Sequence, residues 1–268
     1  MELSNKKIVM ETILVHQKIK ISIMEDIKLL EKIATQQERS IKLLNRIYEH
    51  LYDEKIGIDL QSAFVKNRIY EVRTNSSFNN LSKDPAMIIQ IVPQEFLLDG
   101  KLDFSAPSLR DAYYHMHPWF EGGYDYCFNS DGFATYNNDE QGITKSYVQF
   151  MRNGVIELYV NALPSTDNTD IFCFDGNSFR GTVAYKITGL IEALKIAEIK
   201  SPYSVYITFV DCNNVQFIYS RKQLRPMSKN SLSIPKFIID DSVDVSKQQG
   251  FRNAMKHIFL ALGGTESY

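Results

Sequence analysis

Hydrophobic residues recur at alternating steps of three and four along the first part of the chain. Residues 1–52 contain no glycine and no proline, and they are rich in residues that favour helices. The spacing is a heptad repeat over about four repeats, which is typical of a coiled coil. The sequence therefore predicts a long, coiled-coil-like helix with a seam formed by Ile23, Ile27, Leu30, Ala34, Gln37, Ile41, Leu44, Tyr48 and Leu51.

This seam predicts association through the N-terminal helix. Isoleucine and leucine at the seam positions favour a homo-oligomer, a dimer or higher, and the same surface would accept a helix of a protein partner. Apolar residues outside the seam, such as Leu29 and Leu43, leave a second interpretation open. In that interpretation the wider apolar face packs against the helix's own domain.

A polar linker and a compact domain are predicted after this helix. Residues 53–85 include the stretch RTNSSFNNLSKDP, which is rich in turn-forming residues and typical of a linker. Residues 86–264 then alternate between short β-branched or aromatic stretches and stretches of helical spacing at 181–200 and 248–264. These elements predict an α+β sensor or binding domain with a mixed, mainly antiparallel sheet and packed helices.

The clearest predicted hairpin spans Ser146–Val160. Asn153 and Gly154 separate two alternating apolar stretches there, and Asn-Gly is the strongest short-range signal of a hairpin because both residues tolerate a positive φ. Arg152 and Glu157 flank the turn and are expected to face each other as a surface ion pair. The stretch is therefore interpreted mainly as scaffold.

A second hairpin is predicted further along the chain. Residues 203–212 are rich in β-branched and aromatic side chains, and residues 215–220 continue with the same character after two asparagines. Because strands joined by a short turn commonly pair with each other, these two stretches are predicted to be partners.

Composition and charge place the chain among ordinary folded proteins. Its 268 residues are 44% hydrophobic and carry a formal net charge of −2, so there is no overall basic excess that favours nucleic acid. Three cysteines without a CxxC pair argue against a disulfide framework and a structural zinc site. The N-terminus lacks a signal-peptide pattern, and no apolar run reaches the roughly 20 residues that span a bilayer. A cytoplasmic protein without membrane association is expected.

The sequence contains none of the common catalytic or nucleotide-binding motifs GxSxG, P-loop and GxGxxG. His115 and His117 would share one face of a strand and could hold a metal, but no carboxylate pattern completes the motif. Asp175, Glu198 and Lys200 follow the order of some metal-dependent nuclease sites, although the helical spacing around Glu198 is unlike the strand that such sites need. We therefore predict no catalytic residue, no metal and no cofactor.

Aromatic residues gather between positions 113 and 128. Phenylalanine, tyrosine and tryptophan make up 12% of the chain, and such rings can stack on bases or bind a peptide. Aromatic residues that alternate along strands also commonly pack as cross-strand pairs in a core. The candidate binding residues are Tyr113, Tyr114, His115, His117, Trp119, Arg152 and Glu157.

A short motif resembles a known bacterial family. Asp131-Gly132-Phe133, followed by the stretch from Phe150 to Glu157, is similar to the C-terminal region of bacterial Schlafen-type proteins that carry an AlbA-like nucleic-acid or ATP-binding module. The likeness covers roughly residues 86–263, including IVPQ at 91–94, and the N-terminal module of that family is absent.

The resemblance implies an accessory role, because any nuclease or ATPase activity of that family belongs to the missing module. The sequence thus predicts a non-enzymatic, oligomeric accessory or sensor protein that binds a partner or ligand in a bacterial defence or stress system. Two alternatives stay open. One is a nucleic-acid-binding module that uses the aromatic and basic residues, and the other is a metal-dependent nuclease.

Overall fold

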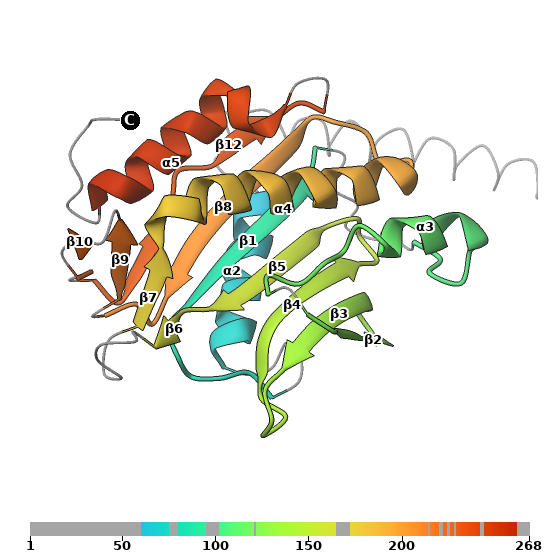
Figure 1. Cartoon of the computed structure of the whole chain (residues 1–268). Coiled ribbons are helices and arrows are strands. Elements are labelled where there is room, and N and C mark those ends of the chain that lie inside the picture. Colours follow the sequence, from blue (N-terminus) through green and yellow to red (C-terminus); the bar gives the residue numbers. More distant parts are fainter. Residues whose placement is uncertain are drawn as a thin grey trace, which may run out of the picture. The chain divides into compact units, whose positions relative to one another are not determined.

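Helices and two sheets make up the described part of the chain (Figure 1). The computed structural model describes residues 60–74, 80–94, 102–120, 122–164, 172–213, 215–219, 222–223, 226–227, 229–241 and 244–261. The helices are α2 (Leu60–Arg73), the short α3 (Arg110–Tyr113), α4 (Gly176–Ile196) and α5 (Gln249–Ala261), with 3₁₀ turns η2 (Pro107–Leu109) and η3 (Val245–Lys247). None of the helices in these residues is long and apolar enough to cross a bilayer.

The larger sheet contains eight strands within the described residues, and its pairings are antiparallel. Its spatial order is β11 (Ser231–Ser233), β8 (Tyr203–Val210), β1 (Ala86–Pro93), β5 (Ile156–Asn161), β4 (Thr144–Met151), β3 (Gly132–Asn138) and β2 (Asp125–Phe128), with β12 (Phe237–Ile239) also paired to β8. The smaller sheet has the order β10 (Lys222–Gln223), β9 (Gln216–Tyr219), β7 (Phe172–Asp175) and β6 (Leu163–Pro164), in which β7 and β9 run parallel.

The N-terminal part of the predicted fold needs correction. The α+β class and the mainly antiparallel sheet agree with the prediction. The first helix that the structure describes is α2, and it lies inside the segment 53–85 that was predicted as a linker. This finding overturns the predicted order of one long helix, a linker and then the sheet. The helix predicted over 1–52, with its nine seam residues, lies outside the described residues.

The buried face of α2 explains why hydrophobic spacing did not indicate this helix. Its buried residues are Gln61, Val65, Arg68 and Val72, which follow one another at about one helical turn. Two of the four are polar, so the apolar stripe on which a sequence-based prediction depends is interrupted. Gln61 Nε2 instead donates a hydrogen bond to the Pro93 carbonyl oxygen at 3.0 Å, which attaches the helix to the end of β1.

The main core lies between the large sheet and the helices α4 and α5, which cross one face of the sheet while α2 lies on the other (Figure 1). Met87, Ile89 and Ile91 alternate along β1 and belong to this core. Val183 and Ile187 of α4 are one turn apart and fully buried in the same cluster. Burial of each such side chain contributes roughly 1.5–3 kcal/mol to the stability of the fold, so these contacts hold α4 and α5 against the sheet.

The hairpin of β4 and β5 is confirmed, but its turn differs from the expected one. The Met151 N–H donates to the Val155 carbonyl at 2.8 Å, and the Gly154 N–H donates to the Met151 carbonyl at 2.9 Å. Within this turn only Gly154 has a positive φ, of 84°, as in a type I turn followed by a left-handed residue. The predicted surface ion pair is wrong, because Glu157 is completely buried while Arg152 is exposed.

Strand β8 does not pair with the strand that follows it in sequence. It pairs with β1 on one side and with β11 and β12 on the other, whereas β9 lies beside β7 and β10 in the smaller sheet. The predicted hairpin of residues 203–212 with 215–220 is therefore wrong. Asp211 has a φ of 51° directly after β8, which ends the extended conformation and redirects the chain.

Candidate functional site

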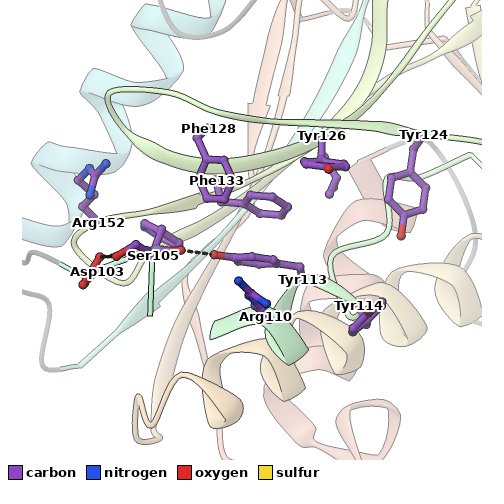
Figure 2. A pocket seen from close by; sticks show the side chains of 12 residues that line it. Asp103, Ser105, Arg110, Tyr113, Tyr114, Tyr124, Tyr126, Phe128, Phe133 and Arg152 are labelled. Carbon is purple, nitrogen blue, oxygen red and sulfur yellow. Dashed lines mark hydrogen bonds between the residues drawn. The ribbon is translucent and has the colours of Figure 1, made fainter. Parts of the chain in front are cut away.

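A cavity opens beside the last two strands of the large sheet, where α3 and the segment before it face β2 and β3 (Figure 2). Its volume is about 870 Å³, within the range of roughly 300–1,000 Å³ that small-molecule sites occupy. We call it the aromatic cavity because most of its wall consists of the rings of Phe104, Tyr113, Tyr114, Tyr124, Tyr126, Phe128 and Phe133.

The alternation of side chains along β2 places two rings on the cavity side. Tyr126 and Phe128 are two positions apart, so their side chains leave the same face of the sheet. Cys127, between them, packs into the cluster on the opposite face. Phe133 of β3 lies directly opposite Phe128 in the register, and their ring centroids are 5.1 Å apart. Tyr126 and Phe128 of β2 therefore form one wall of the cavity.

A tight turn joins β2 to β3 and brings their rings together. The Asn129 side-chain oxygen accepts hydrogen bonds from the backbone N–H groups of Asp131 at 3.0 Å and Gly132 at 2.9 Å. Gly132 has a φ of 150°, and a Cβ atom at this position would lie 2.1 Å from the Phe150 carbonyl oxygen. Only glycine fits there, which gives the Asp-Gly-Phe motif a structural role.

Tyr113 and Phe133 form the floor of the cavity. Their rings are stacked, with centroids 3.8 Å apart and planes inclined by 18°. The Tyr113 hydroxyl donates to the Phe104 carbonyl oxygen at 2.8 Å, and burial raises the pKa of this hydroxyl. The hydroxyl therefore stays protonated at neutral pH and keeps the ring in place. A floor that is fixed in advance reduces the entropy lost on ligand binding.

Three further rings at the cavity remain largely open to solvent. The exposed fractions are 73% for Tyr114, 67% for Tyr126 and 57% for Phe128. Single exposed apolar side chains are common on proteins, but a group of exposed rings around one hollow marks an interaction surface. The rings offer flat faces on which a planar group can stack.

Positive charge lies at the rim of the aromatic cavity. The Arg152 guanidinium is 5.8 Å from the centroid of the Phe104 ring, which orients it. Arg110 is exposed and makes no ion pair with any of the described residues. Asp103 is the acid in the lining, and hydrogen bonds from the Ser105 hydroxyl and N–H lower its pKa. Two arginines and one aspartate leave the lining with a net positive charge.

A second charged group of residues lies beneath α2 and is buried apart from Glu71, which has 31% of its side chain exposed. The Glu157 carboxylate is completely buried. It accepts hydrogen bonds from Arg68 at 3.0 Å, from the Gln90 amide at 2.8 Å and from the Tyr147 hydroxyl at 2.8 Å. Arg68 also donates to Glu71 at 2.6 Å. We call these five residues the buried polar cluster.

The buried polar cluster is a structural link between α2 and the sheet. Burial opposes the charge on Arg68, but the adjacent Glu157 carboxylate outweighs it and holds the pKa of the guanidinium above its ordinary value. A carboxylate with three donors leaves little capacity for another ligand. The cluster therefore fixes α2 in position and offers no open binding surface.

The structure assigns the predicted binding residues to different places. Tyr113, Tyr114 and Arg152 line the aromatic cavity. Glu157 lies in the buried polar cluster, so the sheet separates the roles of the two residues that flank the β4–β5 turn. Side chains alternate between the two faces along a strand, and the Glu157 side chain lies on the face that α2 covers.

The remaining predicted residues lie outside the cavity lining. The His117 ring meets the edge of Tyr124 at a centroid distance of 5.5 Å, and Trp119 packs on Phe179 at 6.2 Å. His115 is half-buried after the end of α3. The described part of the chain contains no group of three or more histidine, cysteine, aspartate or glutamate residues that could hold a metal ion.

Some cavity residues were missed at the level of sequence. Asp103 and Arg110 gave no signal, because Asp103 lies in an irregular segment and Arg110 begins the four-residue helix α3. Phe133 was noticed only as part of a motif, although it lies in the cavity floor. A detectable signal was present in β2, where Tyr126 and Phe128 alternate with residues of the other face.

The residues that mimic a nuclease motif do not lie together on strands. Asp175 ends β7, whereas Glu198 and Lys200 follow the end of α4. Glu198 has a φ of 60°, a left-handed conformation that terminates the helix. The strand context that this chemistry requires is therefore missing at Glu198.

No protein-family model, curated protein or solved structure matches the chain. The resemblance to Schlafen-type proteins therefore stays a prediction.

Proposed function

We propose that this domain is a non-enzymatic binding domain, which captures a flat apolar group that carries a negative charge. The observation that supports this most strongly is the aromatic cavity itself. It has a volume of about 870 Å³, a stacked aromatic floor and exposed rings at its edge. A large apolar pocket with a few convergent polar groups is the usual form of a ligand site.

The charges of the lining select the sign of the ligand. Arg110 is exposed, so it can turn its guanidinium toward a carboxylate or phosphate. The exposed Arg152 guanidinium donates to the carbonyl oxygens of Ser130 at 3.1 Å and Leu102 at 3.4 Å, which holds its charge at the rim. Asp103 is occupied by hydrogen bonds from Ser105. A ligand anion would therefore meet two cations and one carboxylate, whose negative charge the neighbouring Arg152 partly offsets. Two arginines are few for the phosphate contacts that support nucleic-acid binding, so a ligand with only one or two negative charges is favoured.

The wider role that fits this site is that of a sensor or accessory protein. Binding in the cavity would report the presence of the ligand to a partner. The resemblance to the C-terminal region of Schlafen-type proteins supports placing this role in a bacterial defence or stress system.

Pairs of small probes test the proposal. Suitable pairs are 2-naphthoate with 2-naphthamide, indole-3-acetate with indole-3-acetamide, and adenosine monophosphate with adenosine. We expect at least one anion to bind with a Kd on the order of 1 mM. This value follows if each non-hydrogen atom of a probe such as 2-naphthoate contributes about 0.3 kcal/mol to the free energy of binding. Its neutral partner should bind about tenfold more weakly, because it lacks the charge-assisted hydrogen bond. Ligand-observed NMR would measure both.

Two charge-matched variants locate the interaction. Arg110→Gln removes a rim cation and should weaken the anion by about tenfold without changing the neutral probe. Arg252→Gln removes an exposed cation from α5 and should change neither. Equal affinity of both members in every pair, or an equal loss in the two variants, would contradict the proposed site.

A further inference from the structure

The outer edge of β2 is the feature that extends the proposed function. The spatial order of the large sheet ends at β2, and no strand among the described residues pairs with its other side (Figure 1). An edge strand carries a row of unpaired backbone N–H and C=O groups, which is a template for another strand. Here the edge borders directly on the aromatic cavity.

The register of the β2–β3 hairpin shows which backbone groups point outward. Asn129 and Gly132 exchange two backbone hydrogen bonds, at 2.9 and 3.3 Å, so they form a hydrogen-bonded pair. Hydrogen-bonded and non-hydrogen-bonded pairs alternate along an antiparallel ladder. Phe128 and Tyr126 therefore occupy non-hydrogen-bonded positions against β3. Their backbone N–H and C=O groups point away from the sheet, toward its open edge.

The same two residues supply the exposed rings of the cavity wall. Tyr126 and Phe128 are 67% and 57% exposed, and both contact the Phe133 ring at centroid distances of 6.0 and 5.1 Å. Each residue thus presents a free backbone amide and a ring on one surface. An extended peptide beside β2 would pair with the amides, and every second side chain would lie next to these rings.

We propose that the partner of the aromatic cavity is an extended peptide, which adds as a further strand to the open edge of β2. This inference rests on the proposed function and names the ligand class of that site. An aromatic side chain of the peptide occupies the cavity above Tyr113, and an acidic side chain two positions away reaches Arg110 or Arg152. Backbone pairing gives affinity, and the alternate side chains give specificity.

The charge and the length of the edge define the peptide further. Both rim cations lie on the cavity side, so the acid and the aromatic residue must fall on the same face of the added strand, at positions i and i+2. β2 has four residues, Asp125–Phe128. A partner strand of about five to seven residues would cover this edge. A heptapeptide is therefore long enough for the whole interaction.

Selection from a random heptapeptide library displayed on phage tests the proposal, with the full chain as the immobilised protein. We expect enriched sequences to carry an aromatic and an acidic residue two positions apart. Each backbone amide of one enriched peptide is then methylated in turn. Methylation of every second amide should weaken binding by about tenfold or more, and methylation of the amides between them should change it by less than about threefold.

Two variants of Phe128 distinguish the contribution of its backbone N–H to peptide binding from the contribution of its ring. Phe128→Ala removes the ring and keeps the outward N–H. Phe128→Pro removes both, and proline is tolerated on an edge strand where the N–H faces outward. The proline variant should bind the enriched peptide about tenfold more weakly than the alanine variant. Unchanged thermal unfolding of both proteins, compared with the unmodified chain, controls for misfolding.

Each outcome decides between the two proposals. Alternating sensitivity to methylation, together with a weaker proline variant, supports strand addition. Failure of the library to enrich any such peptide, uniform sensitivity to methylation, or equal binding by the alanine and proline variants would overturn it. If the aromatic anions still bind in an Arg110-dependent way, only the peptide inference is lost and the cavity remains a small-molecule site.

Discussion

The aromatic cavity and the buried polar cluster use the same residue types on one sheet, but in opposite ways. In the buried polar cluster the Glu157 carboxylate is fully buried and accepts from Arg68 and two further donors. In the aromatic cavity Arg110 is exposed and Tyr126 keeps 67% of its surface open. Polar groups that satisfy one another stabilise a fold, whereas open ones are available to a ligand.

The β4–β5 turn joins these two regions. Arg152, before Gly154, lines the cavity, and Glu157, after it, enters the buried polar cluster. The chemical type of a residue therefore does not reveal its role. Its side of the sheet and its degree of burial do, and both follow from the register.

Glu157→Ala should be the most destabilising change. It leaves the Arg68 charge and two further donors buried without their acceptor, at a cost of about 5 kcal/mol in the free energy of unfolding. Urea denaturation followed by circular dichroism would measure this loss. Arg68→Met combined with Glu157→Met removes both charges and should recover most of the stability. A loss below about 1 kcal/mol in the single variant would mean that the cluster does not hold α2.

The two phenylalanines that face each other across β2 and β3 should separate stability from binding. Phe133 is 3% exposed and Phe128 is 57% exposed. Phe133→Ala should cost about 3–4 kcal/mol, because it empties a packed site. Phe128→Ala should cost less than about 1 kcal/mol but weaken aromatic probes by about tenfold. Denaturation and probe titration on both variants measure this, and similar losses of stability would remove the contrast.

The turn between the two regions should give the smallest effect. Gly154→Ala introduces a side chain at a φ of 84°, 3.1 Å from a methyl carbon of Ile199. The expected cost is about 1–2 kcal/mol. Asn153→Ala removes a hydrogen bond of 3.2 Å to the Val155 N–H and should cost about 0.5 kcal/mol. Thermal unfolding of both variants would show the order, and a larger loss for Asn153→Ala would contradict the assigned turn.

The spacing of hydrophobic residues predicted those elements whose formation depends on neighbouring residues in the sequence. The alternation around Asn153-Gly154 identified the β4–β5 hairpin, and apolar spacing identified α4 and α5. Helix α2 was not predicted, because half of its buried residues are polar. Gln61 and Arg68 are bonded to Pro93 and Glu157, which are distant in the sequence. The pairing of β8 with β1 was not predicted either, because the two strands are distant in sequence and meet only in the assembled sheet.

The candidate site was predicted in part for the same reason. Tyr113 and Tyr114 stood out in an aromatic stretch, and Arg152 stood out beside a turn. Their convergence with Phe133 and Arg110 depends on how the segment before β2 folds over the sheet. Glu157 was misplaced because a turn-flanking acid is normally solvated, and its buried partner Arg68 lies 89 residues away in sequence.

The most direct test of the central claim is a titration of the uniformly ¹⁵N-labelled chain with each of the three probe anions in turn, followed through amide chemical shifts. We expect at least one anion to give saturable shifts at the amides of β2, Phe133 and Arg110, which surround the aromatic cavity. The amide shifts of Arg68 and Glu157 should not change, because the Glu157 carboxylate is completely buried and is already paired with Arg68. Saturable shifts centred on the buried polar cluster, or no saturable shift at any amide up to about 10 mM probe, would contradict the account.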